Sequence, residues 1–317
     1  MENIVPPLPA NAKCRRCGAR GDIRLPSHNT LFCRECYIRF CETAVSRAME
    51  KFAIPKDGCL MVAVSGGKDS LALWDLLNKL GYNTRGLHIN LGIEGFSEAS
   101  ADAVSDFASA RDLLWAHYSL KKIFGWTVPE IRERTRRSIC SLCGTVKRQL
   151  LNRLTVKEGF NVLVSGHNLD DEAGRLLGNI LRNRTQYFEK QYPCLPAAGP
   201  RMPAKAKPLY RLESRELRAY CHFASITPHT AKCPLSHGAT SHIIKEALDF
   251  LEDKMPGTKR DFLFSHLRRR QPPELDQSMR SCERCGEPAF LPVCSVCNLK
   301  AHLEAIREKN ENGAAGE

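Results

Sequence analysis

The stretch VAVSGGKDSLALWDLL, residues 62–77, decides the fold of this chain. It begins with an apolar run typical of a short buried strand and ends in the amphipathic pattern of a helix. Between them stand two glycines, a lysine, an aspartate and a serine. Glycine lets backbone N–H groups approach a ligand closely, and a helix N-terminus adds partial positive charge. The stretch therefore predicts a site for a phosphate group.

The spacing excludes the usual nucleotide-triphosphate loop, which places four residues between its first glycine and its Gly-Lys-Ser/Thr end. The loop instead resembles the PP-loop of ATP pyrophosphatases, which split ATP between its α and β phosphates and transfer AMP to a substrate. The alternative is a glycine turn that binds nothing. The residues of the resemblance are Ser65, Gly66, Gly67, Lys68, Asp69 and Ser70.

Apolar strand-like runs alternate with helical patterns along the middle of the chain. The runs cover residues 60–64, 86–93, 115–120 and 161–166. This alternation predicts an α/β fold with a doubly wound parallel sheet and with ligands at the carboxyl ends of the strands. The PP-loop and the motif SGHNLDDEA, residues 165–173, would both lie there. The proline-rich residues 193–208 are interpreted as an extended connection.

Two pairs of C-x2-C motifs stand near the ends of the chain. Each pair offers four thiolates at the spacing of a tetrahedral structural zinc site, and the segments around them have few apolar positions of their own. We expect two zinc ribbons; the competing interpretation is a redox dithiol. The expected ligands are Cys14, Cys17, Cys33 and Cys36 in the first ribbon and Cys282, Cys285, Cys294 and Cys297 in the second.

The length of 317 residues allows a sizeable core with appendages. We expect a zinc ribbon at 1–41, a catalytic domain at 42–270, a second ribbon at 271–303 and a disordered tail at 304–317. The chain has no apolar run long enough to cross a membrane, and its first residues lack the apolar core of a signal peptide. A cytoplasmic protein without a membrane partner is expected.

The chain is basic, with 47 Lys and Arg against 35 Asp and Glu and a formal net charge of +12. Basic residues concentrate at 132–153 and at 182–218, beside the proposed active-site segments. Such a bias fits contacts to the phosphate backbone of a nucleic acid, which position it without reading its sequence. A solvated basic surface is the alternative.

A third C-x2-C motif, in RRSICSLCGTVKRQLL, places Cys140 and Cys143 on one side of a helical turn. Neighbouring basic residues, Lys147 among them, are expected to lower the pKa of these thiols, as a reactive or metal-bound cysteine requires. Two thiolates are an incomplete site for a structural metal. A third could come from Cys233 in HTAKCPLSH, but the residues alone leave Cys233 open between a ligand and an inert loop cysteine.

The order of these motifs resembles the tRNA 2-thiouridine synthetases of the TtuA type, over nearly the whole chain. That resemblance implies a fold like the adenine nucleotide alpha hydrolases and a [4Fe-4S] cluster on Cys140, Cys143 and Cys233. The fourth iron would lack a protein ligand and could carry a hydrosulfide. The catalytic lysine and aspartate of the family would fall on Lys147 and Asp171.

The resemblance also implies a mechanism. The PP-loop would hold the phosphates of ATP with Mg²⁺, and Ala63, His88, Ile89 and Gly166 would line the nucleotide site together with Asp171. The O2 atom of a uridine, expected in the T-loop of tRNA, would attack the α-phosphorus, and sulfide from the cluster would then displace AMP. The expected partners are tRNA, a sulfur donor (a ubiquitin-like thiocarboxylate protein or inorganic sulfide) and a second copy of the chain.

Four alternatives stay open. The same chemistry could act on the wobble uridine. A PP-loop enzyme could adenylate without sulfur transfer, although it would not need three thiolates. A zinc protein that binds nucleic acid without catalysis would not need the SGGKDS loop. Finally, disulfide or persulfide cysteines could replace the cluster, which only an iron assay excludes.

Overall fold

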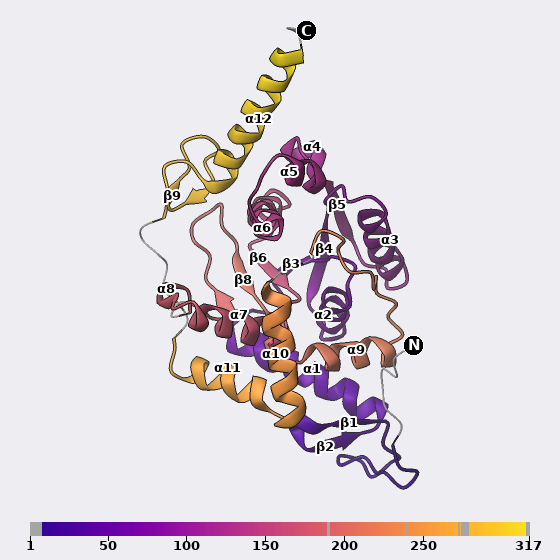
Figure 1. The fold of residues 1–317 in the computed structure, drawn as a ribbon. Helices are drawn as coiled ribbons and strands as arrows, with labels where there is room; N and C mark the ends of the chain where they lie inside the picture. The colour runs from indigo at the N-terminus through magenta and orange to yellow at the C-terminus, as the bar shows by residue number, and fades with distance from the viewer. Residues whose placement is uncertain are drawn as a thin grey trace.

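A six-stranded sheet forms the centre of the protein, seen in a computed structural model (Figure 1). The strand order is β5-β4-β3-β6-β8-β7, and β7 alone runs antiparallel to its neighbour. The strands are β3 (Cys59–Ala63), β4 (Asn83–Asn90), β5 (Trp115–Ser119), β6 (Val162–Ser165), β7 (Cys194–Leu195) and β8 (Ala204–Ala206). The structure describes residues 8–314 except 189–190, 237, 239, 272 and 274–278.

Helices cover both faces of this sheet. Leu60 and Val62 on β3 pack into a core shared with α1, α2, α3 and α9, whereas Met61 packs into a second core with α5, α6 and α12. Successive side chains of a strand point to opposite faces, so a sheet covered on both sides buries all of them. The prediction of a doubly wound α/β fold is therefore confirmed. The helices are α1 (Arg34–Lys51), α2 (Lys68–Lys79), α3 (Phe96–Ser109), α4 (Leu120–Phe124), α5 (Val128–Glu133), α6 (Ile139–Lys157), α7 (Leu169–Leu181), α8 (Thr185–Phe188), α9 (Ser214–Phe223), α10 (Thr240–Lys254), α11 (Thr258–Arg268) and α12 (Ser295–Ala314), with the 3-10 turn η2 at Pro208–Arg211.

The sheet brings the two expected ligand loops together. Strands β3 and β6 are parallel neighbours, and their last residues, Ala63 and Ser165, are in register. The PP-loop follows β3 and leads into α2, while the SGHNLDDEA motif follows β6 and leads into α7. Asn168 begins α7 with a capping box, because its side chain accepts from the Asp171 N–H and the Asp171 carboxylate accepts from the Asn168 N–H.

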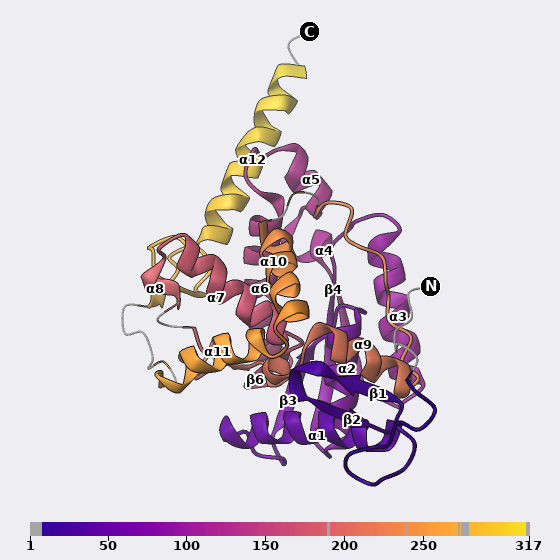
Figure 2. The same ribbon diagram turned by 60° about the horizontal axis from the view of Figure 1, so that its bottom comes forward.

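Two small cysteine-rich units lie near the two ends of the chain (Figures 1 and 2). The first contains β1 (Ile23–Leu25), the 3-10 turn η1 (Pro26–His28) and β2 (Thr30–Phe32), and the second contains β9 (Arg280–Ser281) and β10 (Pro288–Ala289). Helix α12 continues to Ala314, whereas the sequence analysis placed the start of a disordered tail at residue 304. The first seven residues, the last three and most of 272–278 lie outside the described residues.

The proline-rich stretch 193–208 contributes β7 and β8 to the sheet instead of serving only as a connection. Both strands are short, and neither contains the β-branched or aromatic residues that mark a strand in sequence. Within the described part of the chain, no helix is both long and apolar enough to span a bilayer.

Candidate active site

One cavity of about 670 Å³ opens at the carboxyl ends of β3, β4 and β6. It collects residues from the PP-loop, the end of β4, the first turns of α6, the start of α7 and the segment 229–236. Of the predicted site residues, those that line it are Ala63, Ser65, Gly67, Asp69, Ser70, His88, Ile89, Cys140, Cys143, Lys147, Gly166, Asp171 and Cys233. Segments far apart in the sequence thus meet in one site.

The PP-loop is held in place by hydrogen bonds from several elements. The hydroxyl of Ser70 donates to the carbonyl of Gly67 at 2.9 Å and accepts from the Ser65 N–H at 3.1 Å. The Ser100 hydroxyl on α3 donates to the Ser65 carbonyl at 2.6 Å, and the His229 N–H donates to the Gly66 carbonyl at 2.8 Å. A loop fixed from three sides offers its backbone to an anion with little ordering cost.

Two predicted residues of this loop do not line the cavity. Gly66 has φ +72° and turns the chain against α3. The ammonium of Lys68 folds back onto Asp69 at 2.7 Å instead of pointing into the site. Gly166 packs closely behind the loop, because a Cβ there would lie 2.9 Å from the Asp69 carbonyl oxygen.

Asp69 and Asp171 place two carboxylates in the cavity. Burial raises the pKa of Asp69, against the opposing effect of Lys68, and the charge of Asp171 raises it further. The side-chain amide of Asn168 donates to Asp69 at 3.1 Å and keeps it oriented. Neighbouring carboxylates beside a phosphate loop are the ligands that Mg²⁺ prefers, so these residues fit the metal that accompanies ATP.

The three cysteines that the resemblance assigns to a cluster, Cys140, Cys143 and Cys233, all line the same cavity. Cys140 and Cys143 lie in the first turn of α6, and the Cys140 sulfur contacts the Leu235 carbonyl at 3.9 Å, two residues beyond Cys233. Burial raises the pKa of Cys143; Lys147 lowers it, and the charges of Cys233 and Cys140 raise it again. The basic neighbours therefore do lower the pKa of this thiol, as expected, but burial outweighs them and the net shift is upward.

These three sulfurs are not spaced for a single metal ion. Among the described residues, only the two four-cysteine sets bring three or more ligand atoms within 4.8 Å of one another, and Cys140, Cys143 and Cys233 are not such a set. A cluster separates its thiolate ligands by several iron and sulfide atoms, so it needs the wider spacing. The three thiols, half-buried or exposed at the cavity, suit a [4Fe-4S] cluster with one iron free of protein ligands.

Lys147 and Asp171 face this cavity from α6 and α7. The ammonium of Lys245 on α10 donates to the Asp171 carboxylate. Although burial raises the pKa of Asp171, Lys245 and His167 hold it below its usual value. Asp171 is therefore ionised at neutral pH and available to orient a substrate or a metal.

Three residues at the site were missed in the sequence. They are Lys245, which pairs with Asp171; His229, whose N–H holds the PP-loop; and Arg148, beside Lys147 in the cavity lining. Arg148 stands within a quoted motif, and His229 begins the segment that leads to Cys233. Lys245 lies in an ordinary helical pattern, and nothing in the sequence around it indicates a functional residue.

His88 forms a buried wall of the cavity. Its Nε2–H donates to the Ser100 hydroxyl at 3.2 Å, because that hydroxyl uses its own proton on the Ser65 carbonyl. Its Nδ1 atom is buried and has no partner within the described residues. An orphaned acceptor in the wall suits the predicted role of His88 beside the nucleoside of ATP.

Stability should fall on acidification because of His88. Burial, followed by the charge of His117, lowers the pKa of His88 from 6.5 to about 4. His88 therefore binds a proton below about pH 6.5 in the unfolded chain but only below about pH 4 in the folded chain. The contribution of neutral His88 to the free energy of unfolding is thus complete above pH 6.5 and decreases as the pH falls toward 4. Between pH 7.5 and 5 the loss is about 2 kcal/mol.

Urea unfolding at both pH values measures this loss. His88→Gln should be less sensitive to pH than the unmodified chain, whereas His117→Gln, which changes the exposed ring stacked on His88, should keep most of the sensitivity. Equal sensitivity in all three proteins would contradict the assignment.

The two four-cysteine sets each fit one tetrahedral metal ion. Their sulfurs lie within 4.8 Å of one another, with 3.6 Å between Cys17 and Cys33 and 3.8 Å between Cys285 and Cys294. Ligands 2.3 Å from a tetrahedral zinc ion stand about 3.8 Å apart. The amide of Gln149 on α6 donates to Cys285 and Cys294, so the second set is attached to the helix that carries Cys140 and Cys143.

Removing one thiolate of the second set should release its metal. Cys282→Ala should contain one equivalent less of this metal than the unmodified chain, and α12 should lose its packing on α6, because a small metal unit folds largely through its ion. Elemental analysis and limited proteolysis around 280–300 measure both effects. Cys194→Ala, a half-buried cysteine outside both sets, is the control; a full metal content in Cys282→Ala would contradict the assignment.

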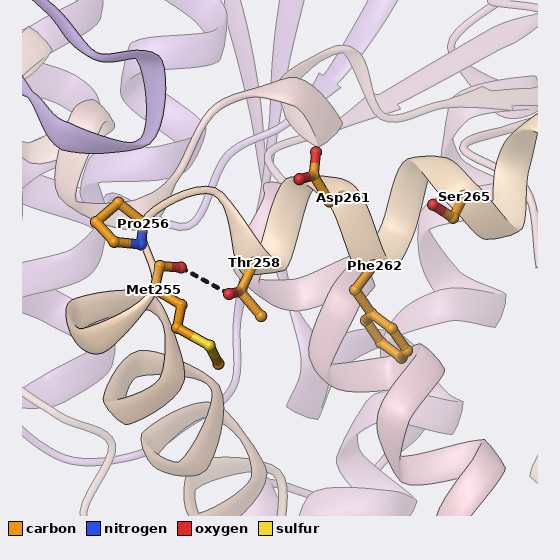
Figure 3. A pocket seen from close by; sticks show the side chains of 6 residues that line it. All are labelled: Met255, Pro256, Thr258, Asp261, Phe262 and Ser265. Carbon is orange, nitrogen blue, oxygen red and sulfur yellow. Dashed lines mark hydrogen bonds between the residues drawn. The ribbon is translucent and has the colours of Figure 1, made fainter.

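A second hollow lies at the turn between α10 and α11 (Figure 3). The Thr258 hydroxyl donates to the Met255 carbonyl at 2.6 Å across this turn. The described residues that line the hollow include a carboxylate and two hydroxyls but no thiol, imidazole or amine. Thiol, imidazole and amine groups line the first cavity instead, among them Cys143, His88 and Lys147. The lining residues are Met255, Pro256, Thr258, Asp261, Phe262 and Ser265.

Comparison with known proteins decides the family. The sequence profile of the PP-loop domain matches residues 41–229, and that of the N-terminal LIM domain of the 2-thiouridine synthetase TtuA matches residues 13–38. The chain is 40% identical, over 90% of both sequences, to a tRNA-5-methyluridine(54) 2-sulfurtransferase of Thermus thermophilus. The chain belongs to the TtuA-type sulfurtransferase family. A Thermotoga maritima enzyme of the same description is 36% identical over 94% of this chain and 99% of its own length.

A solved relative supports the same assignment from its fold. The U34-tRNA thiolase NcsA of Methanococcus maripaludis, solved with its [4Fe-4S] cluster, superposes with a TM-score of 0.79. The two chains are 26% identical, and the match covers 92% of this chain and 96% of NcsA. This fold is therefore shared with a thiolase whose name refers to position 34.

Proposed function

We propose that this chain is an ATP-dependent tRNA 2-sulfurtransferase that converts the T-loop uridine at position 54 to its 2-thio form. The observation that carries the proposal is the single cavity that combines a phosphate loop, a lysine, two carboxylates and three thiols. An adenylating enzyme without sulfur transfer would use the first of these groups but not the thiols. Three relatives at 36–40% identity carry names that specify position 54, whereas the name of NcsA, at 26% identity, specifies position 34.

The reaction has two steps that conserve oxidation state. The uridine O2 attacks the α-phosphorus of ATP and pyrophosphate leaves; sulfide then attacks C2, and the C2–O bond breaks to release AMP. The PP-loop backbone binds the phosphates, Asp69 and Asp171 hold Mg²⁺, and Lys147 neutralises charge on the phosphate or the base. When bound by Cys140, Cys143 and Cys233, the [4Fe-4S] cluster supplies an iron on which sulfide can be held beside the substrate.

The remaining parts of the assignment are also proposals. The two four-cysteine units hold zinc, at 1–41 and 271–303, on either side of the catalytic domain at 42–270, and sulfide comes from a ubiquitin-like thiocarboxylate protein or from inorganic sulfide. A homodimer would cover the exposed apolar side chains of α10, among them Ile243 and Phe250, each 63% exposed. Light scattering of the purified protein tests the dimer, and elemental analysis tests the zinc.

A single-turnover reaction tests which phosphate bond of ATP breaks and whether each cleavage leads to one sulfur transfer. Protein prepared without oxygen is mixed with ATP labelled at the α-phosphate, sulfide and unmodified tRNA. We expect one AMP and one pyrophosphate for each 2-thiouridine formed. ADP as the labelled product, or AMP formed without thiouridine, would contradict the proposal.

A further inference from the structure

A third cavity, of about 440 Å³, lies between the first cysteine-rich unit, α1, η2 and α11 (Figure 2 turns this end of the molecule toward the viewer). We call it the arginine cavity, because five of its lining residues are arginines and only one is an acid. It shares no lining residue with the catalytic cavity. Its charged and imidazole residues are Arg16, His28, Arg47, Arg211, Arg260, Asp261 and Arg268.

A histidine beside a buried carboxylate orients one of these arginines. The guanidinium of Arg260 donates to Nδ1 of His28 at 3.2 Å, so Nε2 of the same ring carries a proton and faces the Glu216 carboxylate at 3.1 Å. The Glu216 side chain is 1% exposed. The His28 ring thus lies between the Arg260 guanidinium, from which it accepts a hydrogen bond, and a buried carboxylate.

Aromatic rings orient two others. The Arg211 guanidinium lies 4.9 Å from the ring centre of Phe264 and 5.7 Å from that of Tyr210, and Arg16 lies 5.9 Å from Phe32. A guanidinium stacked on a ring keeps the N–H groups at its edge available to an anion.

The positive charge of the cavity is barely compensated. Across the described part of the chain, Arg16, Arg47, Arg211 and Arg268 have no ion pair with a carboxylate, and Arg260 reaches Asp261 only at 3.8 Å. Arg268 donates to the Ser265 hydroxyl at 3.0 Å. Five like charges in one hollow repel one another unless an anion joins them, and planar guanidinium groups match the oxygens of a phosphate.

We infer that the arginine cavity binds a backbone phosphate of the tRNA, away from the uridine that reacts. This inference rests on the proposed function. A phosphodiester has the charge and geometry that oriented arginines recognise, and the basic surface continues along the chain at Arg269 and Arg270, as a polyanion requires. ATP is not the expected occupant, because the PP-loop lines the other cavity.

Salt-dependent binding of tRNA tests the inference. The double variant Arg47→Gln/Arg268→Gln removes two charges that stabilise no carboxylate, and Lys56→Gln/Lys309→Gln removes the same charge from exposed positions elsewhere. We expect the arginine variant to bind full-length tRNA about tenfold or more weakly at 0.1 M salt, with a log–log salt slope smaller by about 1 to 2. ATP binding, and the affinity for an isolated T-arm stem-loop, should be unchanged.

Each other outcome overturns the inference in a distinct way. An affinity and slope equal to those of the lysine variant mean that no phosphate is bound there. An equal loss for the isolated T-arm means that the contact is not remote. If inorganic phosphate stabilises the unmodified chain but not the arginine variant, and the two bind tRNA equally, the cavity is a site for a free anion. If only an acidic protein stabilises the unmodified chain in this way, the cavity is a site for a protein. An unmodified chain that binds no tRNA contradicts the proposed function as well.

Discussion

Cys233→Ala is expected to abolish thiolation, with a loss on the order of a thousandfold or more, because one of three ligands to the cluster disappears. The residue lies half-buried in a loop at the cavity, and alanine removes only its sulfur. The fold and the PP-loop should therefore survive, and ATP should still bind. Iron and sulfide analysis of protein reconstituted without oxygen, together with thiolation rates, measures the effect.

Cys59→Ala is the matched control for this variant. Cys59 is exposed at the start of β3, outside the cavity, and accepts only a hydrogen bond from the Asn83 amide. It should retain full iron content and activity. If Cys233→Ala loses activity while the unmodified chain contains no iron, the chemistry uses a persulfide; if Cys233→Ala is fully active, Cys233 is not part of the site.

Gly66→Ala is expected to weaken ATP binding about a hundredfold or more, which corresponds to roughly 3 kcal/mol. The residue has φ +72°, and a Cβ there would lie 2.4 Å from the backbone oxygen of Ser100. Neither the PP-loop nor α3 can accept that contact without a shift of the backbone, and the phosphate site would move with it. Titration calorimetry with a non-hydrolysable ATP analogue measures the affinity.

Gly81→Ala is the control that distinguishes the clash of the new Cβ at residue 66 from the strain of placing alanine at a positive φ. Gly81 follows α2 with φ +81°, so alanine suffers a similar strain there, but no atom lies within 4 Å of its Cβ. This variant should lose roughly 1–2 kcal/mol of stability and keep its affinity for ATP. Similar affinities in the two variants would show that the contact with Ser100 does not shape the site.

The central architecture followed from local signals in the sequence. The apolar run before Ser65 became β3, the amphipathic pattern after it became α2, and the two C-x2-C pairs came together as two sets of four sulfurs. These features depend on the periodicity of apolar residues and the spacing of cysteines within short segments, and both can be read from the sequence. Cys233 was grouped with Cys140 and Cys143 only through the resemblance of the motifs to a known family, and in the structure all three line one cavity.

Contacts between distant segments could not be predicted in the same way. Lys245 meets Asp171 only because α10 packs on α7, and β8 joins the sheet through its backbone, whose hydrogen bonds do not depend on strand-like side chains. The pKa of Cys143 was misjudged because the sequence shows basic neighbours but not burial. The arginine cavity likewise gathers residues from five separate segments.

Mapping the sulfur in the tRNA by nucleoside mass spectrometry tests both the proposed reaction and its position. The reaction contains protein prepared without oxygen, ATP, sulfide and unmodified tRNA, and the digested tRNA is assigned position by position. The account predicts 2-thiouridine at position 54, formed only when ATP is present. Sulfur at position 34 would contradict the proposed substrate position, and ATP consumption with no sulfur in the tRNA would contradict the function itself.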